Sequence, residues 1–382
     1  MRFKIIFYLF VFLLIFAGLN GCTEKKVEQK KIAFGPYLQN MGDDKVTICW
    51  TTQDGMTTLK NTQGKIDTVN NYRMHKTIIA RLQGNTTYNY DILNDGSDEG
   101  KGTFTTFPEK AQPFRFCVLG DTRSNHDIHQ RIVNNIINEK PLFVINTGDL
   151  VGNGNVMSDW EHFFKINKEL IRNVPYFSVL GNHEKDSENY YNFFSLPGNE
   201  RYYFYSVGNA LFVILDMEGP NYDAPGYLHG EARDKFWNEI GKDYLVKEKK
   251  WLENVLTLNN GADFIFVFFH PTFYSIKKSR VAEAKERRKF WGDIFERHHV
   301  QAVFNGHDHY YHHAEHGGTH YIVTAGGGAG LYSTDAPQPE TVFYKKINHY
   351  MTVDVGMEKS EIRAIDIDGN LMEKIIVDKI KQ

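Results

Sequence analysis

Carboxylates, an amide and imidazoles follow five apolar segments of the sequence, each at the point where the segment ends. They are Asp121 in GDTR, Asp149 in TGDL, Asn182 and His183 in GNHE, His270 in FFHP, and His307 and His309 in GHDH. Taken singly, an aspartate after a strand often caps the next helix, and a histidine beside aromatic residues is usually a packed residue. Gathered at one edge of a sheet, such groups would be costly to bury unless metal ions neutralised them.

The residue types favour transition-metal ions such as iron, zinc or manganese. Carboxylate oxygens, an amide oxygen and neutral imidazoles form a mixed oxygen and nitrogen set, and no cysteine shares the pattern. One carboxylate can bridge two ions held about 3.5 to 4 Å apart, an arrangement that clamps both the attacking and the leaving oxygen of a phosphoryl transfer. This number of ligands is therefore better explained by two ions than by one.

The elements that must position these residues are expected in residues 113–382. Continuous apolar strands such as FRFCVLGD and LFVINTGD alternate there with amphipathic helices such as NHDIHQRIVNNIINEK. This alternation predicts βαβ units, and ligands of open α/β sheets bind beyond the carboxyl ends of the strands. The segments after Tyr344 alternate as strands and are expected to complete the sheet.

A different pattern occupies residues 32–108. Short alternating runs such as KVTICWTT, HKTIIARL and GTFTTF are separated by turn residues, and no helical period is present. We expect a small all-β sandwich, in which Tyr88 has the place of a corner tyrosine.

The first 21 residues have the character of a secretory signal, with two cations, an apolar run over residues 5–19 and no acid. The run is shorter than the roughly 20 residues of a membrane-spanning helix. It ends in LNGC, which resembles a bacterial lipoprotein box with Cys22 as the acylated residue, and the polar residues 22–31 then serve as a tether. We expect an exported, membrane-anchored lipoprotein that faces the periplasm or the cell surface of a bacterium.

Charge and cysteine content narrow the class of partner. Without the signal, 42 Lys and Arg oppose 47 Asp and Glu, a net charge of about −5, and no basic surface for nucleic acid is evident. Cys49 and Cys117 lie within apolar runs and are expected to be buried free thiols.

Together, the five motifs resemble those of the calcineurin-like metallophosphoesterases, in the same order. The stretches FSLPGNERYYFYSVGNALFVILD, KKWLENVL and FVFFHPTFYS resemble the purple acid phosphatase branch more narrowly. FGPYLQN, VTICWTT and TFTTFPEK are similar to the fibronectin type III-like domain that precedes such phosphatases. The resemblance implies a domain of two mixed β-sheets flanked by helices, which binds two metal ions and hydrolyses phosphoesters with a metal-activated hydroxide.

The resemblance also implies a role for each residue. Asp149 would be the bridging carboxylate, Asp121 and His309 would hold the first metal, and Asn182, His270 and His307 would hold the second. His183 would steady the phosphate or protonate the leaving alkoxide, with Glu184 orienting it.

Two positions depart from the family pattern. Purple acid phosphatases place a tyrosinate three residues after the bridging aspartate, where this chain has Gly152, and other members place a histidine where it has Arg123. Water or the side chain of Asn153, His126 or His129 could supply the missing ligand of the first metal, although both histidines are expected on the following helix. An iron-loaded protein is therefore not expected to be purple.

Arg123 and Arg280 are the cations considered for phosphate binding. Arg123 forms either a salt bridge to Asp121 or a neighbouring acid, or a guanidinium fork for the substrate phosphate. Arg280, and less so Lys277 and Lys278, follow HPTFYS in a region that contacts phosphate in the purple branch.

Other features carry weaker expectations. TAGGGAG has no lysine of a phosphate-binding loop. The remaining residues fall into two groups: histidines expected on an exposed hairpin (His312, His313, His316 and His320) and tyrosines that either line the substrate entrance or simply pack (Tyr190, Tyr191, Tyr310 and Tyr311).

The sequence thus predicts a phosphate monoesterase at a membrane surface. A phosphodiesterase of the same superfamily and a non-catalytic surface-binding lipoprotein are the alternatives. The leaving group would be selected by residues 185–199 and 219–243.

Overall fold

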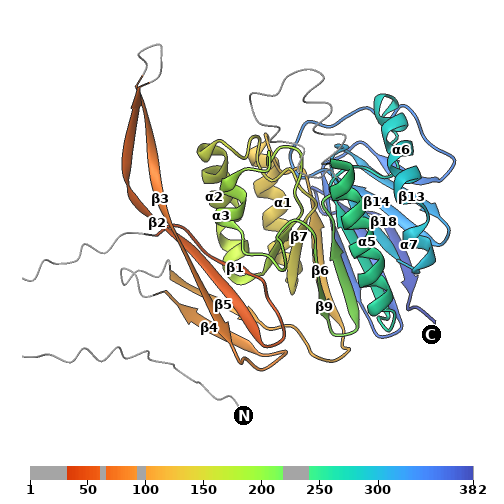
Figure 1. Ribbon diagram of the computed structural model, residues 1–382, viewed down its shortest axis with the longest axis horizontal. Coiled ribbons are helices and arrows are strands. Elements are labelled where there is room, and N and C mark those ends of the chain that lie inside the picture. The colour runs from red at the N-terminus through yellow and green to blue at the C-terminus, as the bar shows by residue number, and fades with distance from the viewer. Residues whose placement is uncertain (1–31, 61–65, 93–99, 218–240, 382) are drawn as a thin grey trace, which may run out of the picture.

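The computed structural model describes residues 32–60, 66–92, 100–217 and 241–381 (Figure 1). The expected signal, the tether with Cys22 and most of the segment 219–243 lie outside these ranges. Within them, no helix is long and apolar enough to cross a membrane.

The N-terminal region is built from β-strands, as expected. Strands β1 (Ile32–Gln39), β2 (Lys45–Lys60) and β3 (Ile66–Ala80) form an antiparallel sheet in that order, and β4 (Thr87–Asp91) pairs with β5 (Lys101–Thr105). The β2 and β3 ribbon extends well beyond the rest of the region (Figure 1). The Tyr88 hydroxyl accepts a hydrogen bond from the Gln83 amide at 2.9 Å, which ties the start of β4 to the preceding turn.

The rest of the chain forms two mixed sheets, which confirms the expected α/β architecture. One sheet has the order β18-β17-β16-β6-β7-β8 and the other has the order β15-β13-β14-β12-β11-β10-β9. The strands of the first sheet are β6 (Phe114–Leu119), β7 (Phe143–Asn146), β8 (Tyr176–Ser178), β16 (His349–Val355), β17 (Lys359–Asp366) and β18 (Leu371–Asp378). Those of the second are β9 (Tyr203–Val207), β10 (Ala210–Ile214), β11 (Phe264–Phe269), β12 (Ala302–Asn305), β13 (Tyr311–His316), β14 (Thr319–Thr324) and β15 (Thr341–Lys345).

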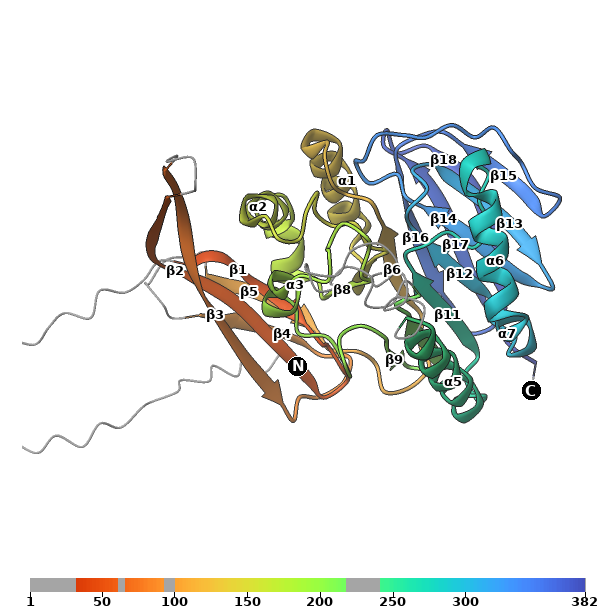
Figure 2. The same ribbon diagram turned by 45° about the horizontal axis from the view of Figure 1, so that its top comes forward.

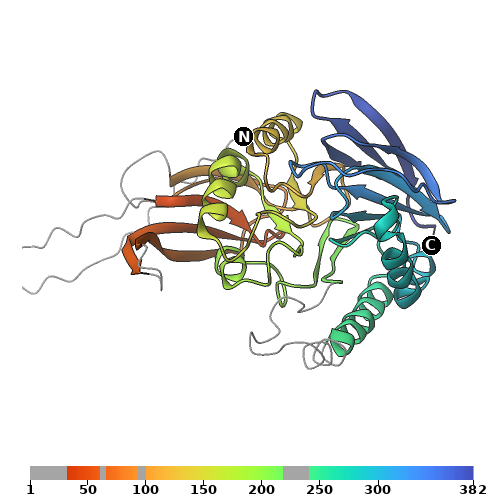
Figure 3. The same cartoon turned by 90° about the horizontal axis from the view of Figure 1, so that it is seen from above.

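Helices cover the outer faces of both sheets (Figures 1 and 2). Beside the first sheet lie α1 (His126–Glu139), α2 (Met157–Asn173) and the short α3 (Glu188–Phe193). The second sheet is covered by α5 (Lys242–Leu258), α6 (Val281–Trp291), which follows the 3-10 turn Lys278–Arg280, and α7 (Ile294–Arg297). Figure 3 shows this layered arrangement from above.

Aromatic side chains fill the space between the two sheets. Phe116 of β6 and Phe143 of β7 are stacked with their ring centroids 5.2 Å apart, and both meet the edge of Phe212 of β10 at 5.1 Å. All three rings are fully buried, so the sheets are fixed face to face by close packing.

The N-terminal strands pack against α2 and α3 rather than standing apart. The hydroxyl of buried Tyr37 donates to the Phe193 carbonyl at 2.6 Å, and the Gln39 amide donates to the Tyr176 carbonyl at 2.8 Å. Cys49 and Cys117 are buried free thiols, as expected.

Candidate metal centre

Three of the expected ligands occupy strained backbone positions just beyond strand ends. Asp121 follows β6 with φ of 55°, Asp149 follows β7 with φ of 57°, and His307 follows β12 with φ of 71°. Residues other than glycine rarely adopt such backbone angles, and the conformation persists only where the surrounding structure imposes it. The sharp turns gather the side chains over a single edge of the two sheets.

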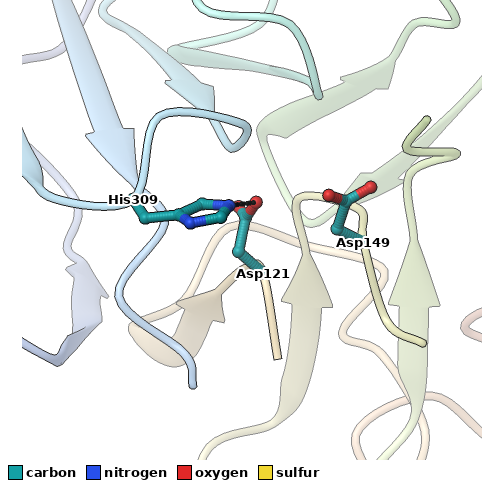
Figure 4. A group of neighbouring side chains, drawn as sticks. All are labelled: Asp121, Asp149 and His309. Carbon is teal, nitrogen blue, oxygen red and sulfur yellow. Dashed lines mark ion pairs between the residues drawn. The ribbon is translucent and has the colours of Figure 1, made fainter. Parts of the chain in front are cut away.

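The first group of ligand atoms comes from Asp121, Asp149 and His309, which are all buried (Figure 4). One ligand atom of each lies within 4.8 Å of the others, and the His309 Nε2 atom is 3.1 Å from Asp121 Oδ1. The structure thus brings together residues from two different sheets.

The hydrogen bonds of His309 show that this group fits a cation. Its Nδ1 atom lies 2.7 Å from the Gly330 carbonyl, which can only accept, so Nδ1 carries a proton and Nε2 is the ring atom turned toward Asp121. Asp121 Oδ1 is buried and receives no hydrogen bond. A cation bound between Asp121 Oδ1 and the Nε2 lone pair of a neutral ring, 3.1 Å apart, would satisfy both atoms.

A second group lies on the other side of Asp149. The His270 Nδ1 atom donates to the Thr147 carbonyl at 2.8 Å, so its Nε2 atom faces Asn182 Oδ1 at 3.2 Å and Asp149 Oδ1 at 3.3 Å. The His307 Nδ1 atom lies 3.0 Å from the same Asn182 oxygen and 3.2 Å from His270 Nε2. Asp149 therefore faces both groups, as a bridging carboxylate must.

The protonation states of these residues suit metal binding. Burial lowers the pKa of His307, and the neighbouring His270 lowers it further, so the ring is neutral and can ligate. Burial raises the pKa of Asp149, but the nearby His270, His183 and Arg123 together outweigh that effect and keep this pKa below its usual value.

Glycines allow the close approach of the ligand loops. Gly148 has φ of 98°, and a Cβ atom there would lie 2.6 Å from His270 Nδ1. A Cβ atom at Gly306 would lie 2.7 Å from the same nitrogen. Both contacts are too short for real carbon atoms, so a side chain at either position would displace His270.

Glu184 has a different role from the one expected. Instead of orienting His183, its buried carboxylate accepts hydrogen bonds from four backbone amides: Gly181 at 2.7 Å, Asp149 at 2.9 Å, Leu150 at 2.8 Å and Val151 at 3.3 Å. Burial and the charge of Asp149 raise the pKa of Glu184 to about 8, while His270 and the amides act in the opposite direction. Both oxygens accept hydrogen bonds, so the carboxylate joins two ligand loops, and it does so as an anion above its raised pKa. In the sequence, only the position of Glu184 at the end of GNHE drew attention to this residue.

His183 is oriented by a backbone carbonyl. Its Nδ1 atom lies 2.5 Å from the Gly152 carbonyl and therefore carries a proton, while its Nε2 atom lies 3.8 Å from Asp149 Oδ2. The side chain is 25% exposed, so it borders the metal groups and remains open to a substrate.

Arg123 forms a salt bridge with a neighbouring acid, and the acid is Asp149 rather than Asp121. The Arg123 Nε atom is 3.2 Å from Asp149 Oδ2, and one terminal nitrogen is 3.4 Å from His309 Nε2. The other donates weakly to Ser124 at 3.4 Å. The guanidinium thus lies at the edge of both ligand groups.

Arg280 contacts the ligand loop instead of open space. One terminal nitrogen donates to the His307 carbonyl at 2.8 Å and to the Asp308 carboxylate at 2.5 Å.

Of the other residues considered for the first metal, His126 stacks on His162 and is exposed on α1. His129 is buried in α1 beside Asn167, at 3.3 Å.

One weaker expectation needs correction, and for most of the tyrosines the structure decides between the two alternatives. His312 and His313 are buried within β13, so the hairpin that carries them is not exposed at these positions, although His316 is. Burial of a strand residue between two neighbouring strands explains the difference. Three of the four tyrosines considered for the substrate entrance are fully buried and simply pack: Tyr190, Tyr310 and Tyr311.

A cleft of about 860 Å³ adjoins the centre beside Arg123. It is lined by residues 124–127, by the glycine-rich residues 328–331, and by Lys346 and Asn348. The Gly330 carbonyl that fixes His309 belongs to this lining.

Residues 114–311, more than half of the chain, match the calcineurin-like phosphoesterase family model. The chain belongs to the calcineurin-like phosphoesterase family. This matched region contains all six residues expected as ligands, and the family's phosphoesterase domain is therefore present.

Curated relatives of this phosphoesterase are distant. An uncharacterized protein of Mycobacterium tuberculosis is 24% identical over 63% of this chain and 50% of its own length. Purple acid phosphatase 13 of Arabidopsis thaliana is 26% identical over 46% of this chain and 33% of its own. The chain spans about half the length, or less, of these relatives.

Solved structures show the same fold. A purple acid phosphatase from yellow lupin matches 90% of this chain and 74% of its own, with a TM-score of 0.68 and 15% identity. PhoD matches 92% and 90%, with a TM-score of 0.63 and 13% identity. Because both matches include the N-terminal strands, the likeness extends beyond the phosphoesterase domain.

Proposed function

We propose that this phosphoesterase hydrolyses phosphate monoesters at a centre of two transition-metal ions, iron, zinc or manganese. The observation that carries the proposal is the gathering of carboxylate, amide and imidazole atoms, with His309 Nε2 3.1 Å from Asp121 and His270 Nε2 3.3 Å from Asp149. Asp121 and His309 would hold one ion, and Asn182, His270 and His307 the other, with Asp149 between them. Bound there, the ions would supply an activated water and Lewis-acid polarisation of the phosphate.

Arg123 supports a monoester as the substrate. Its guanidinium pairs with Asp149. Once metal ions are bound, the charge of that carboxylate would be neutralised by the ions instead of by Arg123. Freed from that pairing, the fork matches two oxygens of a phosphate dianion and can hold both. A diester presents fewer charged oxygens to the same fork.

His183 supplies a proton to the leaving group. The Gly152 carbonyl holds the proton on Nδ1, so Nε2 is the atom that faces the edge of the centre. In the imidazolium form, Nε2–H can be donated to the alkoxide oxygen as the phosphorus–oxygen bond breaks.

The chain outside the phosphoesterase domain also enters the proposal. The N-terminal strands would be a fibronectin type III-like domain, which the Tyr88 hydrogen bond and the antiparallel sheet support. Cys22 would carry the lipid that anchors an exported protein, a reading that rests on the LNGC motif. Cys22→Ala would then move the protein from the membrane fraction to the soluble fraction.

Hydrolysis of phenyl phosphate and of bis(p-nitrophenyl) phosphate, with manganese, zinc or iron supplied in turn, tests the activity. We expect metal-dependent turnover of the monoester to exceed that of the diester, and Asp149→Ala to abolish both. Glu286→Ala, at an exposed carboxylate on α6, is the control and should keep full activity. Unchanged turnover in Asp149→Ala would refute the bridging role, and preference for the diester would reassign the substrate.

A further inference from the structure

Three side chains form a layered column at the side of the metal centre. The ring of Tyr332 stacks on the imidazole of His309, with centroids 3.9 Å apart and planes 21° from parallel. The Lys277 ammonium lies over the Tyr332 ring, 3.5 Å from its centroid. The backbone reinforces the stack, since the Tyr332 amide donates to the His309 carbonyl at 3.0 Å.

Lys277 and His309 must lie on opposite faces of Tyr332. An ammonium 3.5 Å from the ring centre and an imidazole 3.9 Å from it would collide if they shared one face. The lysine is therefore held by a cation–π contact, with the ring of Tyr332 between it and His309 of the first ligand group. It is partly exposed, so the ammonium can be reached from solvent.

The acids around Lys277 are already engaged. Asp308 pairs with Arg280 at 2.5 Å, and its other oxygen accepts from Tyr310 at 2.6 Å. Asp335 accepts from the Lys278 amide at 3.0 Å. Among the described residues, no carboxylate forms an ion pair with Lys277.

The charge of Lys277 is thus left without a counterion of its own. Burial lowers the pKa of this lysine and the nearby Arg280 lowers it further, while Asp308 and Asp335 act in the opposite direction without cancelling the effect. Because the contact with Tyr332 already holds the ammonium in place, binding an anion would cost little additional side-chain entropy.

We propose that Lys277 is a specificity residue, which binds a second anionic group, carboxylate or phosphate, on the leaving group of the substrate. The proposal rests on the phosphoesterase activity proposed above and adds the substrate class, phosphate monoesters whose leaving group is itself anionic. Tyr332 positions the lysine, and Arg280, neutralised by Asp308, holds the ligand loop.

A set of aryl phosphates tests this assignment with the full metal-loaded protein. Phenyl phosphate has a neutral leaving group, 4-carboxyphenyl phosphate adds a carboxylate, and hydroquinone bisphosphate adds a phosphate. In Lys277→Met, we expect kcat/KM for one or both substrates with an anionic leaving group to fall about 10- to 100-fold, the size of effect expected for a charge-assisted hydrogen bond. Phenyl phosphate should change less than about twofold, and Lys277→Arg should restore much of the loss.

Two further lysines provide matched controls. Lys278→Met removes the same charge from the adjacent, exposed residue and should leave all three substrates unchanged. Lys346→Met removes a cation from the cleft on the Arg123 side. If Lys346→Met, and not Lys277→Met, lowers turnover of the anionic substrates, the leaving group lies in that cleft and the proposal is wrong.

The two proposals fail in different ways. An equal effect of Lys277→Met on all three substrates, or no effect on any, would overturn the specificity role while leaving the phosphoesterase activity in place. Absence of phenyl phosphate turnover in the metal-loaded, unmutated protein would instead overturn the activity on which this inference rests.

Discussion

Replacing Glu184 by glutamine should loosen the metal centre without touching any metal ligand. One carboxylate oxygen accepts from the amides of Asp149 and Gly181, and the other accepts from Leu150 and Val151. Glutamine has nearly the same shape, but one of its two terminal groups is an NH2, which cannot accept. Whichever way the amide turns, two buried N–H groups lose their acceptor.

The size of the effect follows from those two lost bonds. A hydrogen bond to a charged acceptor contributes about 1.5 to 3 kcal/mol, so the loss of two would destabilise the fold by about 3 to 6 kcal/mol. The glutamine no longer buries a charge, an offset that favours the lower end of this range. Residues that support metal ligands typically change metal affinity 10- to 100-fold, and we expect a loss of about that size here.

Urea denaturation and competition with a metal chelator measure the two effects. Both are best performed at pH 8.5, above the raised pKa of Glu184, where the unmutated carboxylate is ionised. Glu286→Gln, at an exposed site on α6, is the matched control and should change stability by less than about 0.5 kcal/mol. A Glu184→Gln protein with unchanged stability and unchanged metal affinity would refute the clamp.

Three more outcomes follow from the structure. Arg123→Ala should raise KM and lower kcat/KM for phenyl phosphate about 10- to 100-fold, with metal content retained; elemental analysis showing metal loss would make Arg123 structural. Gly148→Ala should displace His270 and lower metal binding at least tenfold, and a fully loaded, active variant would contradict the close contact. Burial lowers the pKa of His129 to about 3, so the unfolded chain binds a proton below pH 6.5 that the folded chain does not. Stability should therefore fall as pH drops from 6.5 toward 3, by up to about 1.4 kcal/mol per pH unit from this residue, and His129→Gln should reduce that slope in denaturation series; an unchanged slope would show that His129 titrates normally.

The gathering of the expected ligands could be predicted from sequence because each of them lies within a few residues of the end of a strand. Asp121 and Asp149 end continuous apolar runs, and parallel strands bring such ends to one edge of a sheet. The order of the elements, the alternation of strands and helices, and the buried thiols were predictable for the same reason: they depend on local pattern.

Contacts between distant segments could not be predicted in this way. The clamp of Glu184 depends on four amides that point to one carboxylate, and backbone direction leaves no trace in residue type. The layer of Tyr332 on His309 depends on how one loop crosses another. His313 was misjudged because β13 becomes a buried strand only after β15 pairs with its free edge.

The position of β6 in its sheet bears on the order in which this protein can assemble. β6 lies between β7, with Val118 opposite Ile145, and β16, with Val118 opposite Met351. A ribosome therefore finishes all six expected ligands, the last of them His309, before β16 begins at His349. Until then the strand that leads to Asp121 has one open edge of unpaired amides and carbonyls, a surface that invites pairing with other chains. The nascent chain is thus most vulnerable to aggregation after all the expected ligands have been synthesised and before β16 has paired with β6, the strand that leads to Asp121.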